Sequence, residues 1–333
     1  MTASNVRPLE LVCPAGTPAA LRAAVEAGAD AVYCGFRDET NARNFPGLNF
    51  TRDELREAIA FAHDHGAKVL VAINTFPRAG DPGPWRRAVD DAAALAVDAV
   101  ILADIGLLAY AAERHSDLRR HLSVQAAAAN SDAVAFYVEA FGVKRVVLPR
   151  VLSVAEIAQM SSAVPCETEV FVFGGLCVMA EGRCSLSSYV TGKSPNTHGV
   201  CSPASHVSYR EEDGCLASRL GDFTINRAGK DEAVGYPTLC KGRFSTSFGT
   251  GHIFEDPVSL DARALLPALR DAGVTALKIE GRQRSRAYVR AVVGAFRETL
   301  DALARGEPMP AGALMGLAEG QSATQGAYVK TWR

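Results

Sequence analysis

The feature that most restricts the fold of this chain is a regular alternation of short β-rich runs with amphipathic helical runs. The predicted strands cover residues 9–13, 31–34, 68–73, 99–103, 122–125, 144–148, 167–173 and 275–279. The predicted helices cover residues 18–27, 51–65, 85–96, 105–114, 131–141, 153–163, 260–272 and 285–304, and Thr51 with Glu54 predicts a capping box. Eight strands, each followed by a helix, are the count of a closed (β/α)₈ TIM-type barrel.

One long segment, residues 174–259, interrupts the seventh strand–helix unit. Without it, the chain has roughly the 250 residues of a plain barrel. We therefore predict a single barrel domain over residues 1–333, with an insertion over 174–259 after the seventh strand. A doubly wound open sheet fits the same alternation and is the alternative fold. The tail from Glu307 is rich in Gly and Ala and is expected to loop over the surface.

Composition excludes several classes of protein. The net charge is −2 and the sequence pI is near 6.4, with no local cluster of Lys and Arg, so no electrostatic footprint for nucleic acid is visible. Residues 1–8 lack the apolar segment of a secretory signal, and four aspartates interrupt the most apolar stretch, 88–112. We therefore expect a cytoplasmic protein without a transmembrane segment, whose eight cysteines stay reduced.

Polar residues follow several of the predicted strands, where a barrel of this type carries its reactive groups. Each has a structural alternative; Asp104, for example, could simply cap the helix that begins at residue 105. Arginines on separate strands could bind a carboxylate through paired hydrogen bonds, or form ion pairs with Asp38, Asp104 or Glu280. The candidate substrate-binding residues are Arg43, Asn74, Asp104, Gln125, Arg150, Glu280 and Arg282.

The insertion carries four cysteines with the spacing C-x6-C-x16-C-x38-C, namely Cys177, Cys184, Cys201 and Cys240. Four thiolates supply the ligands of a [4Fe–4S] cluster, and they also suit tetrahedral zinc, although zinc sites usually contain C-x2–4-C pairs. Buried thiols without a metal are the third interpretation. Cys215, after the hairpin signal Asp213-Gly214, is the rival for the fourth ligand position.

Several segments carry a resemblance to a known family. The run from Glu169 to Cys177, continued by Glu181-Gly182-Arg183-Cys184, resembles the signature of the collagenase-like (U-type) peptidase family, with Gly175 where Ser or Ala is usual. Further segments resemble the branch of that family that acts in O₂-independent ubiquinone biosynthesis: 11–16, 40–45, 148–152, 194–197, 235–243, 278–285 and 326–328.

The resemblance implies a [4Fe–4S] cluster on Cys177, Cys184, Cys201 and Cys240, and it gives Cys215 no ligand role. It further implies a heterodimer with a homologous iron–sulfur subunit, and hydroxylation of the aromatic ring of a ubiquinone precursor without dioxygen. Prephenate, the oxygen donor of RNA-hydroxylating relatives, is a plausible donor here. No H-E-x-x-H or G-x-S-x-G motif supports peptidase activity. An RNA-modifying hydroxylase and a non-catalytic iron–sulfur scaffold remain the alternative functions, and a zinc-bound structural protein is a further option.

Overall fold

The computed structural model describes residues 9–232, 234–310, 314–318 and 322–329. The predicted absence of a secretory signal concerns residues 1–8, which lie outside these ranges. None of the helices within them has the length and hydropathy that a membrane span requires.

The barrel is closed by hydrogen bonding between its first and last strands. β14 pairs with β1 on one side and with β7 on the other, and all neighbouring pairs from β1 to β7 are parallel. This confirms the predicted (β/α)₈ barrel and excludes the open sheet. Its strands are β1 (Glu10–Pro14), β2 (Ala31–Cys34), β3 (Lys68–Ile73), β4 (Ala99–Leu102), β5 (Arg120–Leu122), β6 (Arg145–Val147), β7 (Glu167–Gly175) and β14 (Ala276–Ile279).

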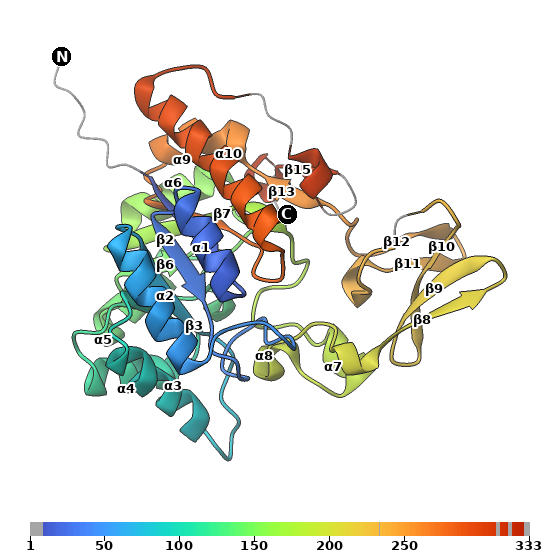
Figure 1. Cartoon of the computed structure of the whole chain (residues 1–333), viewed down its shortest axis with the longest axis horizontal. Helices are drawn as coiled ribbons and strands as arrows, with labels where there is room; N and C mark the ends of the chain where they lie inside the picture. Colours follow the sequence, from blue (N-terminus) through green and yellow to red (C-terminus); the bar gives the residue numbers. More distant parts are fainter. Residues whose placement is uncertain (1–8, 233, 311–313, 319–321, 330–333) are drawn as a thin grey trace.

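Helices cover the outside of the barrel (Figure 1). Thr51 and Glu54 form the predicted capping box at the start of the second helix, and the long last helix packs against the first. The helices are α1 (Pro18–Glu26), α2 (Arg52–Asp64), α3 (Gly83–Ala94), α4 (Ile105–Arg114), α5 (Ser131–Phe141), α6 (Val154–Ala163), α9 (Leu266–Asp271) and α10 (Arg286–Arg305).

Two buried hydrophobic clusters follow from the alternation of side chains along the strands. The larger cluster lies between the strands and the helices and includes Trp85 and Phe296. The smaller one lies inside the barrel, on alternate positions of β1 to β4 and β14; its members are Val12, Ala31, Tyr33, Leu70, Ala72, Ala99, Ile101 and Ala276. One side of the barrel interior is therefore apolar.

The other side of the interior, near the amino-terminal ends of the strands, is charged, and we call it the barrel floor. Glu169 on β7 is fully buried; its two carboxylate oxygens accept hydrogen bonds from Lys278 Nζ at 2.6 Å and Arg145 Nη1 at 3.1 Å. Arg145 also donates to Glu167 at 2.8 Å and forms an ion pair with Glu10. Each floor charge is thus paired with a charge of opposite sign.

After β7 the chain leaves the barrel and forms an arm, residues 176–258, that extends to the right in Figure 1. The arm contains α7 (Leu186–Thr191), α8 (Pro195–His198), β8 (Val207–Glu212), β9 (Cys215–Leu220), β10 (Phe223–Ala228), η3 (Leu239–Lys241), β11 (Arg243–Thr246) and β12 (Gly249–His252). Its strands form a three-stranded and a two-stranded antiparallel sheet, separate from the barrel. The cysteine-bearing segment has its own secondary structure.

The chain rejoins the barrel differently from the prediction. The predicted helix over 260–272 was wrong in its first half: β13 (Ser259–Asp261) pairs antiparallel with the end of β7, and the helix proper is α9. The long β7 extends past β14, and the returning segment supplies hydrogen-bond partners for backbone groups at its upper end. The helical periodicity of 260–272 does not reveal such a long-range pairing.

Two smaller expectations were also wrong. The strand predicted over 122–125 ends at Leu122, because Ser123 caps a 3₁₀ turn, η1 (Val124–Ala126), through the Gln125 N–H. The described part of the tail does not loop loosely over the surface: β15 (Ala323–Thr324) pairs with β13, and Tyr328 is buried. The rest of that expectation concerns residues outside the described ranges.

Candidate metal centre at the barrel mouth

Four separate segments of the arm carry the four cysteines of the predicted ligand set. Cys177 follows β7, Cys184 precedes α7, Cys201 follows α8, and Cys240 lies in η3. The first part of the arm is folded back on the barrel: Arg43 N–H donates to the Gly199 carbonyl at 2.8 Å. α7 also lies against η3. These contacts bring the four segments to the carboxyl ends of the barrel strands, which we call the barrel mouth.

The electrostatics of the thiols show that they are neighbours. Burial, together with the thiols of Cys177, Cys201 and Cys184 and against the opposing effect of Lys241, raises the pKa of Cys240 to about 12. Burial also raises the pKa of Cys201, with Cys184 among the groups that act on it. The four thiols therefore lie near enough to influence one another electrostatically.

Two kinds of metal centre make different demands on the spacing of four thiols. Within the described ranges, no three Cys, His, Asp or Glu side chains lie close enough to hold one metal ion. A tetrahedral zinc requires all its ligands at one ion, whereas each thiolate of a [4Fe–4S] cluster binds a different iron atom.

A further polar group at the site lacks a partner. The Ser202 hydroxyl, next to Cys201, is buried and has no hydrogen-bond partner among the described residues. Hydrogen bonds to the sulfurs are one means by which proteins tune iron–sulfur clusters. An unpaired hydroxyl beside a ligand cysteine is consistent with such a group, so the residues present fit the cluster that the resemblance implies.

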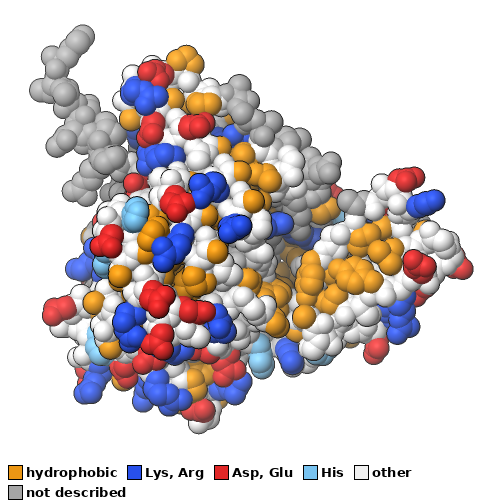
Figure 2. Space-filling model, viewed as in Figure 1, with side chains coloured by type: hydrophobic (Ala, Val, Ile, Leu, Met, Phe, Trp, Pro, Cys, Tyr) orange, Lys and Arg blue, Asp and Glu red, His pale blue; other side chains and the backbone are white. Residues whose placement is uncertain are grey.

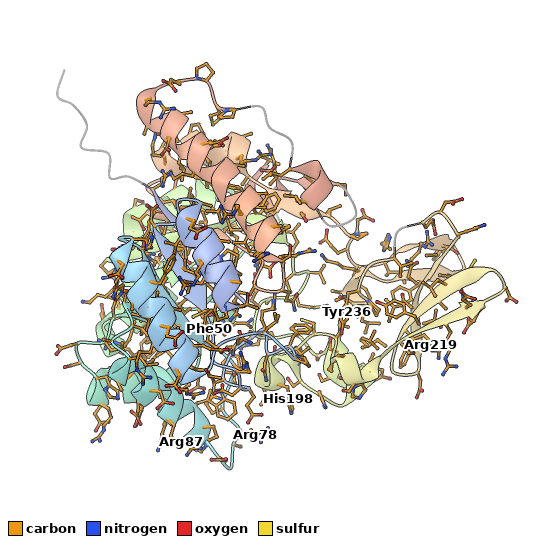
Figure 3. All side chains as sticks on the ribbon, in the orientation of Figure 1. Phe50, Arg78, Arg87, His198, Arg219 and Tyr236 are labelled. Atoms are coloured by element: carbon orange, nitrogen blue, oxygen red, sulfur yellow. The ribbon has the colours of Figure 1, made fainter. Side chains whose placement is uncertain are left out.

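Cys240 is tied to the barrel through the segment that precedes it. Tyr236, labelled where the arm meets the barrel in Figure 3, donates its hydroxyl to the Ser202 carbonyl at 2.8 Å. Its ring packs edge-on against Phe45 of the β2–α2 loop, with ring centroids 6.3 Å apart. Cys215 is placed differently: it begins β9 at the predicted hairpin turn, where its charged neighbour is Arg243. Cys13 and Cys34 are buried core thiols.

Glu280 and Arg43 lie beneath the thiols. The carboxylate of Glu280 is 3.4 Å from Arg43 Nε and 3.4 Å from the Gly175 nitrogen. Burial acts to raise the pKa of Glu280, but Arg43, Arg150 and Arg284 outweigh it and hold that pKa below its usual range. Glu280 also raises the pKa of Arg43, and Cys201 and Cys177 act in the same direction. An ionised carboxylate and a guanidinium therefore face the sulfur site.

Arg43 also has an unusual backbone conformation. Its φ is +122°, a region that side chains other than glycine seldom adopt. The strain of this conformation is of the kind that accumulates at binding and catalytic sites.

Arg150 is the second arginine of the mouth, and its partner was not predicted. Its Nη1 donates to Glu181 at 2.7 Å, and its guanidinium lies over the Phe171 ring, 3.5 Å from the ring centre. Its Nε is buried and has no partner among the described residues. Glu181 lies between Cys177 and Cys184, and only its place in the quoted motif could have indicated a role.

Arg282, by contrast, is buried and donates its hydrogen bonds to other groups of the protein. It is 4% exposed, and it donates to Asn41 Oδ1 at 3.1 Å and to the Ala42 carbonyl. Asn74 holds the same loop, accepting from the Ala42 N–H at 2.9 Å and donating to Ser123 Oγ at 3.1 Å. Both residues position the loop that carries Arg43.

The remaining two candidates have structural roles. Asp104 caps α4 by accepting from the Leu107 N–H at 2.9 Å, which is the alternative considered for it. Gln125 lies on η1, where its backbone carbonyl meets Gly182 of the cysteine loop. The structure thus brings Arg43, Arg150 and Glu280 together at the sulfur site, and places Arg282, Asn74, Asp104 and Gln125 around it as supports.

One cavity among the described residues lies away from the predicted site. It has a volume of about 340 Å³ and opens between the β2–α2 loop and the start of α3, near Arg87 and Arg78 in Figure 3. Its lining is polar and shares no residue with the predicted site; it consists of Asp38, Glu39, Thr40, Asn44, Arg52, Pro84, Arg87 and Asp91. This cavity is therefore separate from the barrel mouth.

Relatives of known name share most of the length of this chain. The tRNA hydroxylation protein P of Escherichia coli (strain K12) is 33% identical over 318 residues, which cover 90% of this chain and 69% of that protein. The 23S rRNA 5-hydroxycytidine C2501 synthase of the same organism is 31% identical over 306 residues, covering 91% of this chain and 41% of the synthase. A collagenase of Porphyromonas gingivalis is 28% identical over 313 residues, covering 91% of this chain and 68% of the collagenase.

The structure of the U32 peptidase Mk0906 aligns with 52% of this chain and 72% of its own, at 20% identity and a TM-score of 0.43. The family model described as Peptidase family U32 matches residues 16–323. This match covers almost the whole chain, barrel and cysteine arm alike, and so the chain belongs to peptidase family U32.

Proposed function

We propose that this chain is the iron–sulfur subunit of an O₂-independent hydroxylase that acts on the aromatic ring of a ubiquinone precursor. The observation that carries the proposal is the convergence of Cys177, Cys184, Cys201 and Cys240 above an arginine-lined barrel mouth. The segments quoted for the ubiquinone branch, which resemble UbiU, support the substrate assignment. The proposed partner is a UbiV-like homologous subunit with its own cluster.

In this proposal the four cysteines hold a [4Fe–4S] cluster, which supplies electron transfer when bound. Arg43 and Arg150 present guanidinium groups to the space beside it, and such groups bind carboxylates through charge-assisted hydrogen bonds. A dicarboxylate oxygen donor such as prephenate suits this chemistry. Glu280, held ionised, orients Arg43.

A second candidate function is hydroxylation of RNA, favoured by the names of the tRNA- and rRNA-modifying relatives. The charge distribution argues against it. Acidic and basic side chains are interspersed over the face shown in Figure 2, and the net charge is −2. RNA-binding surfaces instead gather basic side chains on one face. Relatives named as proteases do not change the expectation that this chain lacks peptidase activity.

One experiment separates the two functions. A deletion strain of the host is grown without oxygen, and both its quinone intermediates and its hydroxylated RNA nucleosides are measured by mass spectrometry. The proposal expects an unhydroxylated quinone precursor to accumulate, with restoration by the native gene but not by Cys240→Ala. Normal quinones together with a missing RNA modification would overturn it in favour of the second candidate. Normal levels of both would favour the non-catalytic scaffold.

A further inference from the structure

A buried ion pair connects the barrel to the loop between the first two cysteines. Arg150 follows β6 and Glu181 belongs to the arm, yet their side chains are only 8% and 6% exposed. Arg150 Nη1 lies 2.7 Å from Glu181 Oε1. A long-range pair with so little exposure differs from the surface ion pairs of this chain, whose side chains lie largely in solvent. Its strength is therefore not lost to screening by water.

The surroundings of the pair fix its geometry. The Arg150 guanidinium stacks over Phe171 of β7, and Tyr328 donates its hydroxyl to the Phe171 carbonyl. Arg150 and Glu181 both act on the pKa of Tyr328, which burial raises, so this ring lies beside the pair as well. Strand β7, the β6–α6 loop, the tail and the cysteine loop thus meet at one point.

The neighbouring residue of the loop is held just as closely. Gly182 has a φ of +75°, and a Cβ atom built there would lie 2.1 Å from the Gln125 carbonyl oxygen. No other residue type fits this contact without displacing η1. Glu181 and Gly182 together therefore press the centre of the loop against two different barrel segments.

The backbone of this loop makes few hydrogen bonds, although Leu176 packs against the core at its start and the Arg183 guanidinium lies over the Phe76 ring near its end. Residues 176–185 form no helix or strand. The described contacts of its backbone include a short turn from Arg183 to Ala180 and a bond from Asn196 to the Cys184 carbonyl at 2.9 Å. A segment with few backbone hydrogen bonds opens at low free energy unless side chains restrain it.

We propose that Arg150 and Glu181 are positioning residues that latch the Cys177–Cys184 loop onto the barrel, so that both thiols stay beside those of Cys201 and Cys240. The inference rests on the proposed function, because it assigns the pair a role in retaining the proposed cluster. Breaking the pair leaves a buried charge without its partner and releases the loop. The barrel itself has its own core and remains folded.

The test uses the full chain purified without oxygen, and compares Glu181→Gln and Arg150→Met with Glu232→Gln. The control residue is matched: Glu232 pairs with Arg243 in the same arm at 3.0 Å, but is half exposed. We measure the half-time of iron release to a chelator, and the cleavage of metal-free protein by a protease within residues 176–185. Unfolding temperature serves as the check on the barrel.

Both latch variants are expected to release iron at least about tenfold faster than the native protein, since breaking a buried pair changes equilibrium constants by more than that. They should also be cleaved in the loop, with the unfolding temperature of the barrel kept and the control behaving as native. Unchanged release and cleavage would overturn the latch, as would an equal effect in Glu232→Gln. If the native protein holds no iron, the proposal of an iron–sulfur cofactor is wrong. The protease cleavage of metal-free protein would still test whether Arg150 and Glu181 restrain the loop.

Discussion

The two ends of the barrel interior use the same residue types in opposite ways. On the floor, both oxygens of Glu169 are engaged at 2.6 and 3.1 Å, and Arg145 is shared among three carboxylates. At the mouth, Glu280 lies 3.4 Å from its nearest arginine, and Arg150 keeps a buried Nε without a partner. Charges on the floor are satisfied by the protein, whereas charges at the mouth retain hydrogen-bonding capacity.

This difference in hydrogen bonding indicates separate roles for the floor and the mouth of the barrel. A buried network whose charged groups are all paired contributes to a single, specific fold, and on the floor only the uncharged His121 keeps an unpaired nitrogen, Nδ1, among the described residues. A buried donor left unpaired costs free energy in the isolated protein, and that cost is recovered when a ligand accepts its hydrogen bond. We therefore expect floor substitutions to reduce stability, and mouth substitutions to reduce metal retention and activity.

The largest effect is expected at the mouth, from Cys240→Ala. Removing one of the four proposed ligands should cost the protein its cluster, seen as loss of iron and of visible absorbance after anaerobic purification. Cys215→Ala, at the hairpin turn of the same arm, should keep both. Four retained irons in Cys240→Ala would show that the ligand set is wrong.

The second effect is on the floor. Arg145→Met leaves Glu169, Glu167 and Glu10 without their shared cation and should lower the free energy of unfolding by about 3–5 kcal/mol. Arg43→Met at the mouth breaks only a long pair with a partly exposed arginine and should cost about 1 kcal/mol or less. Urea unfolding of the two variants checks the contrast, and equal losses would remove the distinction between floor and mouth.

The floor should also make stability depend on pH through His121. Burial, followed by the nearby Arg145 and Arg119, holds the pKa of His121 well below its usual value of 6.5. Below about pH 6.5, His121 therefore binds a proton in the unfolded chain but stays neutral in the folded chain. The free energy of unfolding consequently falls as the pH drops, by about 1.4 kcal/mol per pH unit. His121→Leu should flatten the dependence between pH 6.5 and 5 in urea unfolding. If the free energy of unfolding of His121→Leu falls with pH as steeply as that of the native protein, the pH dependence comes from other groups.

The smallest effect tests a residue that lies at the mouth and caps a helix there. Asp104→Ala removes the N-cap of α4 and should cost about 1 kcal/mol of stability. Anaerobic hydroxylation by this variant should match that of the native protein. A loss of activity without a change in stability would indicate that Asp104 binds the substrate.

Much of the barrel was predictable because its signals are local. β3 (Lys68–Ile73) and α4 (Ile105–Arg114) lie where the sequence predicts them, since a run of buried apolar residues and a capping aspartate define their limits. β13 was missed because its pairing partner, β7, is distant in sequence. The cysteine ligands could be proposed from their spacing and resemblance, which do not depend on knowing the fold.

The remainder of the site was not predictable for a physical reason. The sequence shows that Arg43, Arg150 and Arg282 follow different strands. It does not show which of these arginines donate their hydrogen bonds to other groups of the protein. Arg282 is engaged by a carbonyl and an amide of one loop, whereas Arg150 pairs with a glutamate of the arm and still keeps its Nε without a partner among the described residues. Such partners are chosen by loop conformation, and loop conformation depends on contacts between distant segments. The charged floor was missed for the same reason.

The short strand β13 has a consequence for how this fold can change during evolution. Because Ser259 pairs with Gly175, the arm leaves and returns at two adjacent residues of one strand pair. Its ends are held together by the barrel, so doubling the length of the arm adds only about 0.6 kcal/mol of closure entropy. Insertions, deletions and whole-arm exchanges therefore leave the strand register beneath them untouched. A lineage can remodel what stands over the mouth, and with it the range of molecules admitted, while inheriting the same barrel.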